Sequence, residues 1–216
     1  MTRRFKLLGL AAVAVLAISA VSVASASAAS FQTQSEPTFL KGLQESKNVF
    51  TTAAGTVKCS EAEFTSGQIS SKSVTSVVVH PKYGGCSAFG QAASVSTTSC
   101  SYTLSIASGT GSTAAGSVTI ACSTGSIVVN VPTGGNCSVT VGAQSFPSGS
   151  GKIDYESVGA GATQAVLVSS TVTGIVYGAS GNICGSAGSA GTYSGSVLTK
   201  GYDQAAFSTQ HGVFVG

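Results

Sequence analysis

The stretch CSYTLSIASGTGSTAAGSVTIAC, residues 100–122, decides the fold class, because apolar and polar residues alternate on both sides of a glycine-rich centre. A period of two is typical of a β-strand that buries one face. Glycine and serine between residues 108 and 116 predict a turn, since glycine adopts positive φ angles without steric cost. The apolar positions then share one face of a hairpin: Tyr102, Leu104, Ile106, Val118, Ile120 and Cys122.

The register of this hairpin predicts a disulfide. If Leu104 lies opposite Val118, then Cys100 lies opposite Cys122 and both cysteines are on the apolar face. The hairpin would therefore be closed at its open end by a covalent bond.

A second predicted hairpin has its turn at residues 159–162. This turn places Tyr155 opposite Val166, and it brings Cys137 level with Cys184. The second pair would hold a glycine-rich stretch of the chain against a strand.

Cys59 and Cys86 are the two cysteines that remain. Six cysteines allow fifteen pairings, and the strand pattern favours three consecutive pairs: 59 with 86, 100 with 122, and 137 with 184. Each bridge should contribute about 3–4 kcal/mol by restricting the unfolded chain. No two cysteines have the short spacing of a zinc site, so the sequence predicts neither a metal nor a cofactor.

Alternation and short apolar runs recur along the rest of the chain, with turn residues between them at intervals of about ten residues. We predict an all-β, disulfide-stabilised fold, an antiparallel β-sandwich, with a closed β-barrel or jelly roll as the alternative. Residues 29–46 are polar and irregular and predict an N-terminal arm. A single β domain then covers residues 47–216, with a long glycine- and serine-rich loop at 178–195.

The first 28 residues predict a signal peptide. Three basic residues precede the apolar stretch 7–23, and small residues follow it, so cleavage is expected after Ala28 or Ala29. A membrane anchor is the alternative, but no basic stop-transfer flank follows. We predict general secretion, an extracellular location and no membrane span after signal removal. The formal charge of +3 disappears with the three basic residues, so nucleic-acid binding is not expected.

The two histidines, His80 and His211, do not lie in any catalytic motif. A nucleophile, a base and an orienting group must meet for acyl transfer, and the sequence contains no recognisable pattern of that kind. Ordinary positions at a strand end and a turn explain both residues, and no catalytic residue is predicted.

Two pairs of carboxylates could act together. Asp154 and Glu156 flank Tyr155, and paired acids on one strand face could hydrolyse a glycoside or bind a cation. Because Tyr155 is predicted to face the core, we expect both acids to face solvent. Glu61 and Glu63 have the same spacing and the same interpretation.

Tyrosines in glycine-rich segments could stack on sugars. The candidates are Tyr83, Tyr193 and Tyr202. Tyrosines near turns commonly pack on the edge of a β-structure, and we favour packing.

Three stretches resemble a known group of proteins: FTTAAGTVKCSEAEF at 50–64, HPKYGGCSAFG at 80–90, and GTYSGSVLTKGYDQAAFSTQHGVFVG at 191–216. They are similar to uncharacterised secreted β-rich proteins of high-GC soil actinobacteria, a group with no assigned activity. The resemblance implies an extracellular β-rich protein and no site residues.

We therefore predict a secreted extracellular or cell-envelope protein, a non-enzymatic structural or binding module with an extracellular or cell-surface ligand. The alternative is a secreted hydrolase acting on polysaccharide or cell-wall material. Such an enzyme would bring His80 or His211 within hydrogen-bond reach of Asp154, Glu156, Asp203 or a serine in a concave pocket. Self-assembly through unprotected strand edges is a third possibility.

Overall fold

The computed structural model describes residues 29–216 except 54, 133–135, 149–150 and 183. Nearly all elements in this part of the chain are β-strands, and the one helical element described is a single 3₁₀ turn, η1 (Gly161–Thr163). The predicted signal peptide and Ala28 lie outside the described residues, whereas Ala29, the second predicted cleavage residue, is buried at the start of the described chain.

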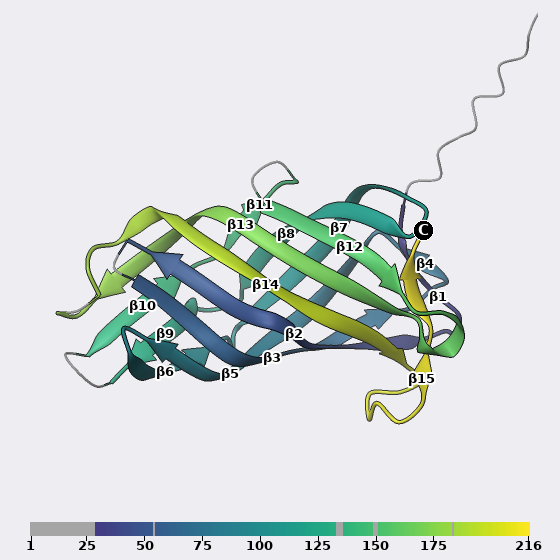
Figure 1. The fold of residues 1–216 in the computed structure, drawn as a ribbon, viewed down its shortest axis with the longest axis horizontal. Helices are drawn as coiled ribbons and strands as arrows, with labels where there is room; N and C mark the ends of the chain where they lie inside the picture. Colours follow the sequence, from purple (N-terminus) through teal and green to yellow (C-terminus); the bar gives the residue numbers. More distant parts are fainter. Residues whose placement is uncertain (1–28, 54, 133–135, 149–150, 183) are drawn as a thin grey trace, which may run out of the picture.

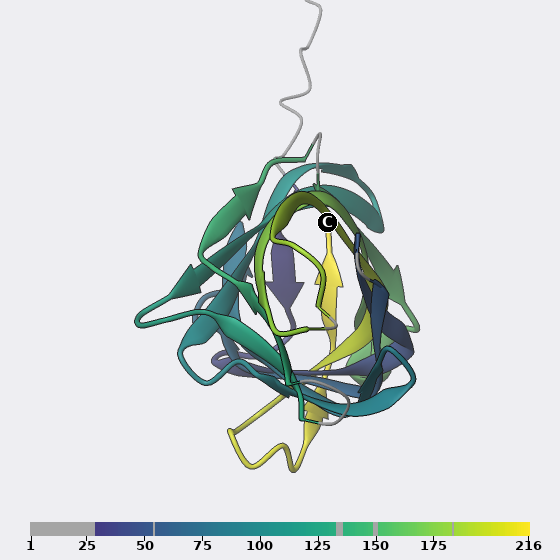
Figure 2. The same cartoon turned by 90° about the vertical axis from the view of Figure 1, so that its left-hand side faces the viewer.

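The strands close into an antiparallel barrel with eight strand positions (Figure 1, Figure 2). Five positions are long single strands: β2 (Thr38–Thr52), β3 (Gly55–Ile69), β5 (Ser76–Ala88), β13 (Ala165–Ser180) and β14 (Gly188–Tyr202). The other three positions join shorter strands: β6 (Gln91–Ser96) with β7 (Cys100–Thr110), β8 (Thr113–Cys122) with β9 (Ile127–Val131), and β10 (Cys137–Val141) with β11 (Gln144–Phe146) and β12 (Gly151–Val158).

The topology is an up-and-down meander. Each position pairs with the positions before and after it in the sequence, and β14 pairs with β2 to close the ring. Closure gives every long strand a partner on both sides, so alternate residues point into one continuous apolar interior.

A small sheet covers one end of the barrel, on the right in Figure 1. It consists of β1 (Phe31–Thr33) between β16 (Val213–Val215) and β4 (Ser73–Val74). Next to it, β15 (Gln210–His211) pairs with the end of β14. The ring of Phe31 lies edge-on to the ring of Tyr155, with 5.0 Å between centroids. The small sheet therefore packs directly against the interior of the barrel.

The connection between β13 and β14 lies across the other end, which faces the viewer in Figure 2. Cys184 in this connection is fully buried and is bonded to Cys137 at the start of β10. The disulfide thus holds the connection against the mouth of the barrel.

The fold agrees with the all-β prediction and takes the barrel alternative instead of the preferred sandwich. Alternation could not separate the two, because both architectures bury one face of each strand. The pairing of β14 with β2 decides the outcome, and it joins the first and last long strands of the sequence.

Within the predicted N-terminal arm or edge segment, residues 29–46, the structure places β1 and the first part of β2, residues 38–46. The register of β2 against β3 shifts between Leu40 and Gly42 and again between Leu43 and Asn48. These irregularities interrupt the period of two in the sequence. A bulged strand therefore gives the sequence pattern of an irregular segment.

The predicted glycine-rich turn and loop are shorter than expected. β7 and β8 extend to Thr110 and from Thr113, and β13 and β14 leave only residues 181–187 between them. A Cβ on Gly116 would lie 1.9 Å from the carbonyl oxygen of Ser105. This glycine permits close strand approach at a bulge and does not form the turn.

All three predicted disulfides are present: Cys59 with Cys86, Cys100 with Cys122, and Cys137 with Cys184. The register of the first hairpin is also confirmed, with Leu104 opposite Val118.

The register of the second hairpin is wrong by two residues, since Tyr155 lies opposite Val168 and not Val166. The turn contains η1 and runs from residue 159 to residue 164. Its centre is therefore displaced along the chain from the predicted position.

Candidate ligand-binding site

A cavity of about 130 Å³ lies in the interior of the barrel. Every strand position and the small end sheet contribute to its lining, which is almost entirely apolar. No charged side chain is among the described residues that line it. Its apolar wall includes Phe31, Phe50, Phe64, Leu104, Val129 and Ile175.

Several residues that line the cavity keep accessible surface although they lie inside the barrel. Phe50, Val95 and Leu104 are half-buried, whereas Val57 and Val79 are each 4% exposed. A densely packed interior would bury all of them. Their incomplete burial agrees with unfilled space inside the barrel.

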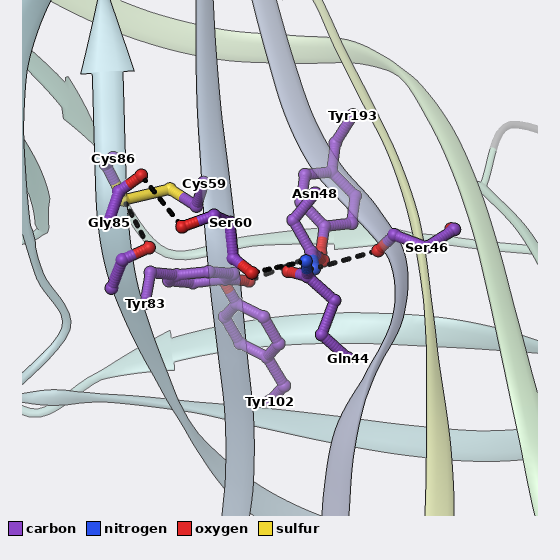
Figure 3. The surroundings of a disulfide bond; sticks show 11 residues. Gln44, Ser46, Asn48, Cys59, Ser60, Tyr83, Gly85, Cys86, Tyr102 and Tyr193 are labelled. Atoms are coloured by element: carbon purple, nitrogen blue, oxygen red, sulfur yellow. Dashed lines mark hydrogen bonds between the residues drawn. A yellow bond between two sulfur atoms is a disulfide. The ribbon is translucent and has the colours of Figure 1, made fainter.

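Three tyrosines from three strands bring their hydroxyl groups together at this cavity (Figure 3). Tyr83 lies on β5, Tyr102 on β7 and Tyr193 on β14. The Oη atom of Tyr83 lies 3.4 Å from that of Tyr102 and 3.4 Å from that of Tyr193. The ring of Phe64 packs on Tyr83 and Tyr102, with 6.1 Å between centroids in both cases.

Asn48 on β2 extends this group, and it is 3% exposed. Its Oδ1 accepts a hydrogen bond from Tyr193 Oη, and its Nδ2 donates to Gln44 Oε1 at 2.7 Å. Gln44 Nε2 in turn donates to the carbonyl oxygen of Ser60 at 2.8 Å. We call Asn48 and the three tyrosines the polar cluster.

Burial keeps the phenol groups of the polar cluster protonated. Desolvation raises the pKa of Tyr102 to about 12, against a smaller lowering effect of the hydrogen bond to Tyr83. Desolvation is also the main reason why the pKa values of Tyr83 and Tyr193 lie well above 10.0, and repulsion between phenolates adds to it. The three side chains are half-buried by area, and all three line the cavity.

A disulfide stabilises the wall beside the polar cluster. Cys59 on β3 lines the cavity and is bonded to Cys86 on β5, with the two Cα atoms 3.9 Å apart (Figure 3). Tyr83 lies three residues before Cys86 on the same strand. The bond therefore fixes the β3–β5 register where Tyr83 enters the interior.

The carboxylates considered from the sequence lie on the outer surface. Tyr155 is 1% exposed and points inward, so Asp154 and Glu156 point outward, as predicted. Lys152 Nζ lies 3.1 Å from Asp154 Oδ2. Glu63 pairs with Lys41 at 2.9 Å, and Glu61 is exposed.

The histidines are also outside the cavity lining. His80 is exposed on β5, and His211 lies on β15 beside the end of β14. Asp203 near His211 accepts hydrogen bonds from Ser208 Oγ and the backbone N–H of Thr209, each at 3.2 Å. These residues form a surface loop and do not meet at the cavity.

The structure separates the three tyrosines proposed as sugar-stacking candidates. Tyr83 and Tyr193 face the barrel interior and line the cavity. Tyr202 packs against Phe207, with 5.3 Å between ring centroids. Sequence reasoning missed Tyr102 and Asn48 as site residues. A tyrosine on the apolar face of a strand does need a polar partner, which could have identified Tyr102. Asn48 gave no such signal because β2 is bulged beside it.

The described residues contain no cluster of histidine, cysteine or acidic side chains arranged to hold a metal ion. No helix in the described part of the chain has the length and apolar character needed to cross a bilayer. No family model matches the sequence, and neither a curated protein nor a solved structure is significantly similar to it.

Proposed function

We propose that this protein is an exported binding protein that holds a small, uncharged and mainly apolar molecule inside its barrel. The observation that supports this proposal is the apolar cavity in the barrel interior with an uncharged polar cluster on its wall. Ligand sites in proteins typically combine an apolar lining with a few placed polar groups. Closed barrels of about eight strands have room for one small ligand.

The size of the cavity indicates the size of the ligand. An apolar protein cavity of about 150 Å³ accepts benzene, and this cavity measures about 130 Å³. A molecule with about one six-membered ring would fill it.

The lining indicates the charge of the ligand. An ion moved into an apolar interior without a partner loses its hydration at a cost of several kcal/mol. Because no charged side chain lines the cavity, a carboxylate or ammonium ligand would find no counter-ion.

The cavity also favours a binding module over a purely structural one. Empty volume costs about 24 cal/mol per Å³ in a protein core, which gives roughly 3 kcal/mol for a cavity of about 130 Å³. Larger side chains could remove this cost. A chain that keeps the space is therefore better explained by an occupant.

Export is supported by the three disulfides, because such bonds persist in oxidising compartments outside the cytosol. It is also supported by the predicted signal peptide. The ligand would then be encountered at or beyond the cell envelope.

Thermal unfolding with benzene tests the proposal. At ten times its dissociation constant, a ligand that binds only the folded state adds about 1.4 kcal/mol, or about 3–5 °C in Tm for a domain of this size. The oxidised mature protein should show this increase.

Two variants make the test specific. Val95→Phe places a ring in the cavity and should abolish the increase. Val78→Phe adds the same ring on the outer surface, where Val78 is 47% exposed, and should preserve it. An unchanged Tm in benzene for the wild-type protein would contradict the proposal.

A further inference from the structure

The direction of hydrogen-bond donation in the polar cluster can be derived from the bond between Gln44 and the backbone of Ser60. Gln44 Nε2 donates to Ser60 O, so its Oε1 is the atom that faces Asn48 and accepts from Asn48 Nδ2. This assigns the amide of Asn48, because an amide oxygen and nitrogen are distinguished by their hydrogen-bond partners. Oδ1 of Asn48 is therefore the acceptor that faces Tyr193.

The protons of the three phenols can then be placed one after another. Each phenol has one proton to donate. Tyr193 gives its proton to Asn48 Oδ1, so Tyr83 must donate to Tyr193. Since the Tyr83 proton is then used, Tyr102 must donate to Tyr83. The chain of donation runs from Tyr102 through Tyr83 and Tyr193 to Asn48.

The first member of this chain is incomplete. Tyr83 and Tyr193 each donate one hydrogen bond and accept one, whereas Tyr102 donates and accepts none from the described residues. Tyr102 lines the cavity. Its Oη atom is therefore an acceptor without a donor at the wall of an apolar space.

We propose, on the basis of the proposed function, that the ligand is a small phenol or cyclic alcohol whose hydroxyl group donates a hydrogen bond to Tyr102 Oη. A hydroxyl donor completes the chain without breaking any of its bonds. A ligand with only an acceptor would have to take the Tyr102 proton away from Tyr83. The raised pKa values of the three phenols support this assignment, because at neutral pH each phenol keeps the proton that it donates.

Binding of phenol, toluene and anisole tests the proposal. Phenol and toluene have nearly the same size, and anisole keeps an oxygen acceptor but has no O–H. Dissociation constants are measured by NMR titration of the oxidised protein, for the wild type and Tyr102→Phe. For each protein we take the ratio of the dissociation constants of two ligands and compare this ratio between the wild type and the variant. The difference in hydration between the free ligands is the same for both proteins and cancels in this comparison.

The preference for phenol over toluene should fall about three- to tenfold in Tyr102→Phe, the effect of one net hydrogen bond. The preference for anisole over toluene should change less than about twofold. Tyr155→Phe is the matched control, since Tyr155 is a buried tyrosine whose hydroxyl donates to Ser105 O outside the cavity lining. Both ratios should keep their wild-type values in this variant.

Tyr83→Phe provides an independent test of direction. It removes the acceptor of Tyr102, so the Tyr102 proton becomes available and anisole should gain about three- to tenfold over toluene. If Tyr102→Phe weakens anisole and phenol equally relative to toluene, the proposed direction is wrong and the binding function stands. If none of the three compounds binds the wild-type protein, the proposed function itself fails.

Discussion

Two tyrosines that point into the same barrel have different surroundings. Tyr155 is 1% exposed, Phe31 packs on its ring, and a Cβ on Gly116 would lie 2.7 Å from its Cε2 atom. Tyr102 is half-buried and borders the cavity. We call the surroundings of Tyr155 the filled region and the surroundings of Tyr102 the open region. The fold can pack a large aromatic ring to completion, so the barrel architecture alone does not impose the cavity.

Removing the whole ring of Tyr155 or Tyr102 should give the largest difference in stability between the two regions. Tyr155→Ala should lower the free energy of unfolding by about 3–5 kcal/mol, because it creates a new cavity in a packed site. Tyr102→Ala should cost about 2 kcal/mol or less, since that ring already lacks neighbours on one side. Urea unfolding of the oxidised proteins at pH 7 measures both. Equal losses would show that the open region is packed as well as the filled one.

Enlarging a side chain should destabilise the filled region but not the open region. Gly116→Ala adds one methyl group to the filled region and should cost about 1–3 kcal/mol, because the new atom meets the Ser105 backbone and the Tyr155 ring. Val95→Phe adds a ring to the open region and should leave stability unchanged or raise it by about 1 kcal/mol. The same urea series measures these variants. A larger loss for Val95→Phe than for Gly116→Ala would exclude unfilled space beside Val95.

The filled region was largely predictable from the sequence, and the open region was not. Alternation predicts Tyr155 on the core side and its flanking acids in solvent, although the register across the next turn is wrong by two residues. These features depend on neighbours along one strand or across one turn.

The open region depends on residues that are distant in the sequence. Asn48 and Tyr193 meet only because β14 closes the barrel on β2, and they are hydrogen-bonded across 145 positions of the chain. The bulges in β2 also hide the inward position of Asn48. No local pattern encodes an empty volume, which is a property of all strands together.

Removing a single hydroxyl group from either tyrosine should change stability least. Tyr102→Phe and Tyr155→Phe should each change the free energy of unfolding at pH 7 by about 1 kcal/mol or less. Their pH dependence is more informative. Desolvation raises the pKa of Tyr102 to about 12 and also raises the pKa of Tyr155, whereas an unfolded tyrosine titrates near 10.

The sign of this dependence follows from proton binding. Below about pH 10 the tyrosine is protonated in the folded and the unfolded protein, and its contribution to the free energy of unfolding is fully present. From about pH 10 to 12 the unfolded chain loses a proton that the folded protein keeps, so the free energy of unfolding falls. Each Phe variant should lose less stability between pH 9 and pH 11.5 than the wild type, as measured by urea unfolding at both values. If the cavity were filled with bulk-like water, Tyr102 would ionise near its ordinary pKa. Tyr102→Phe would then follow the wild-type curve, and only Tyr155→Phe would differ from it.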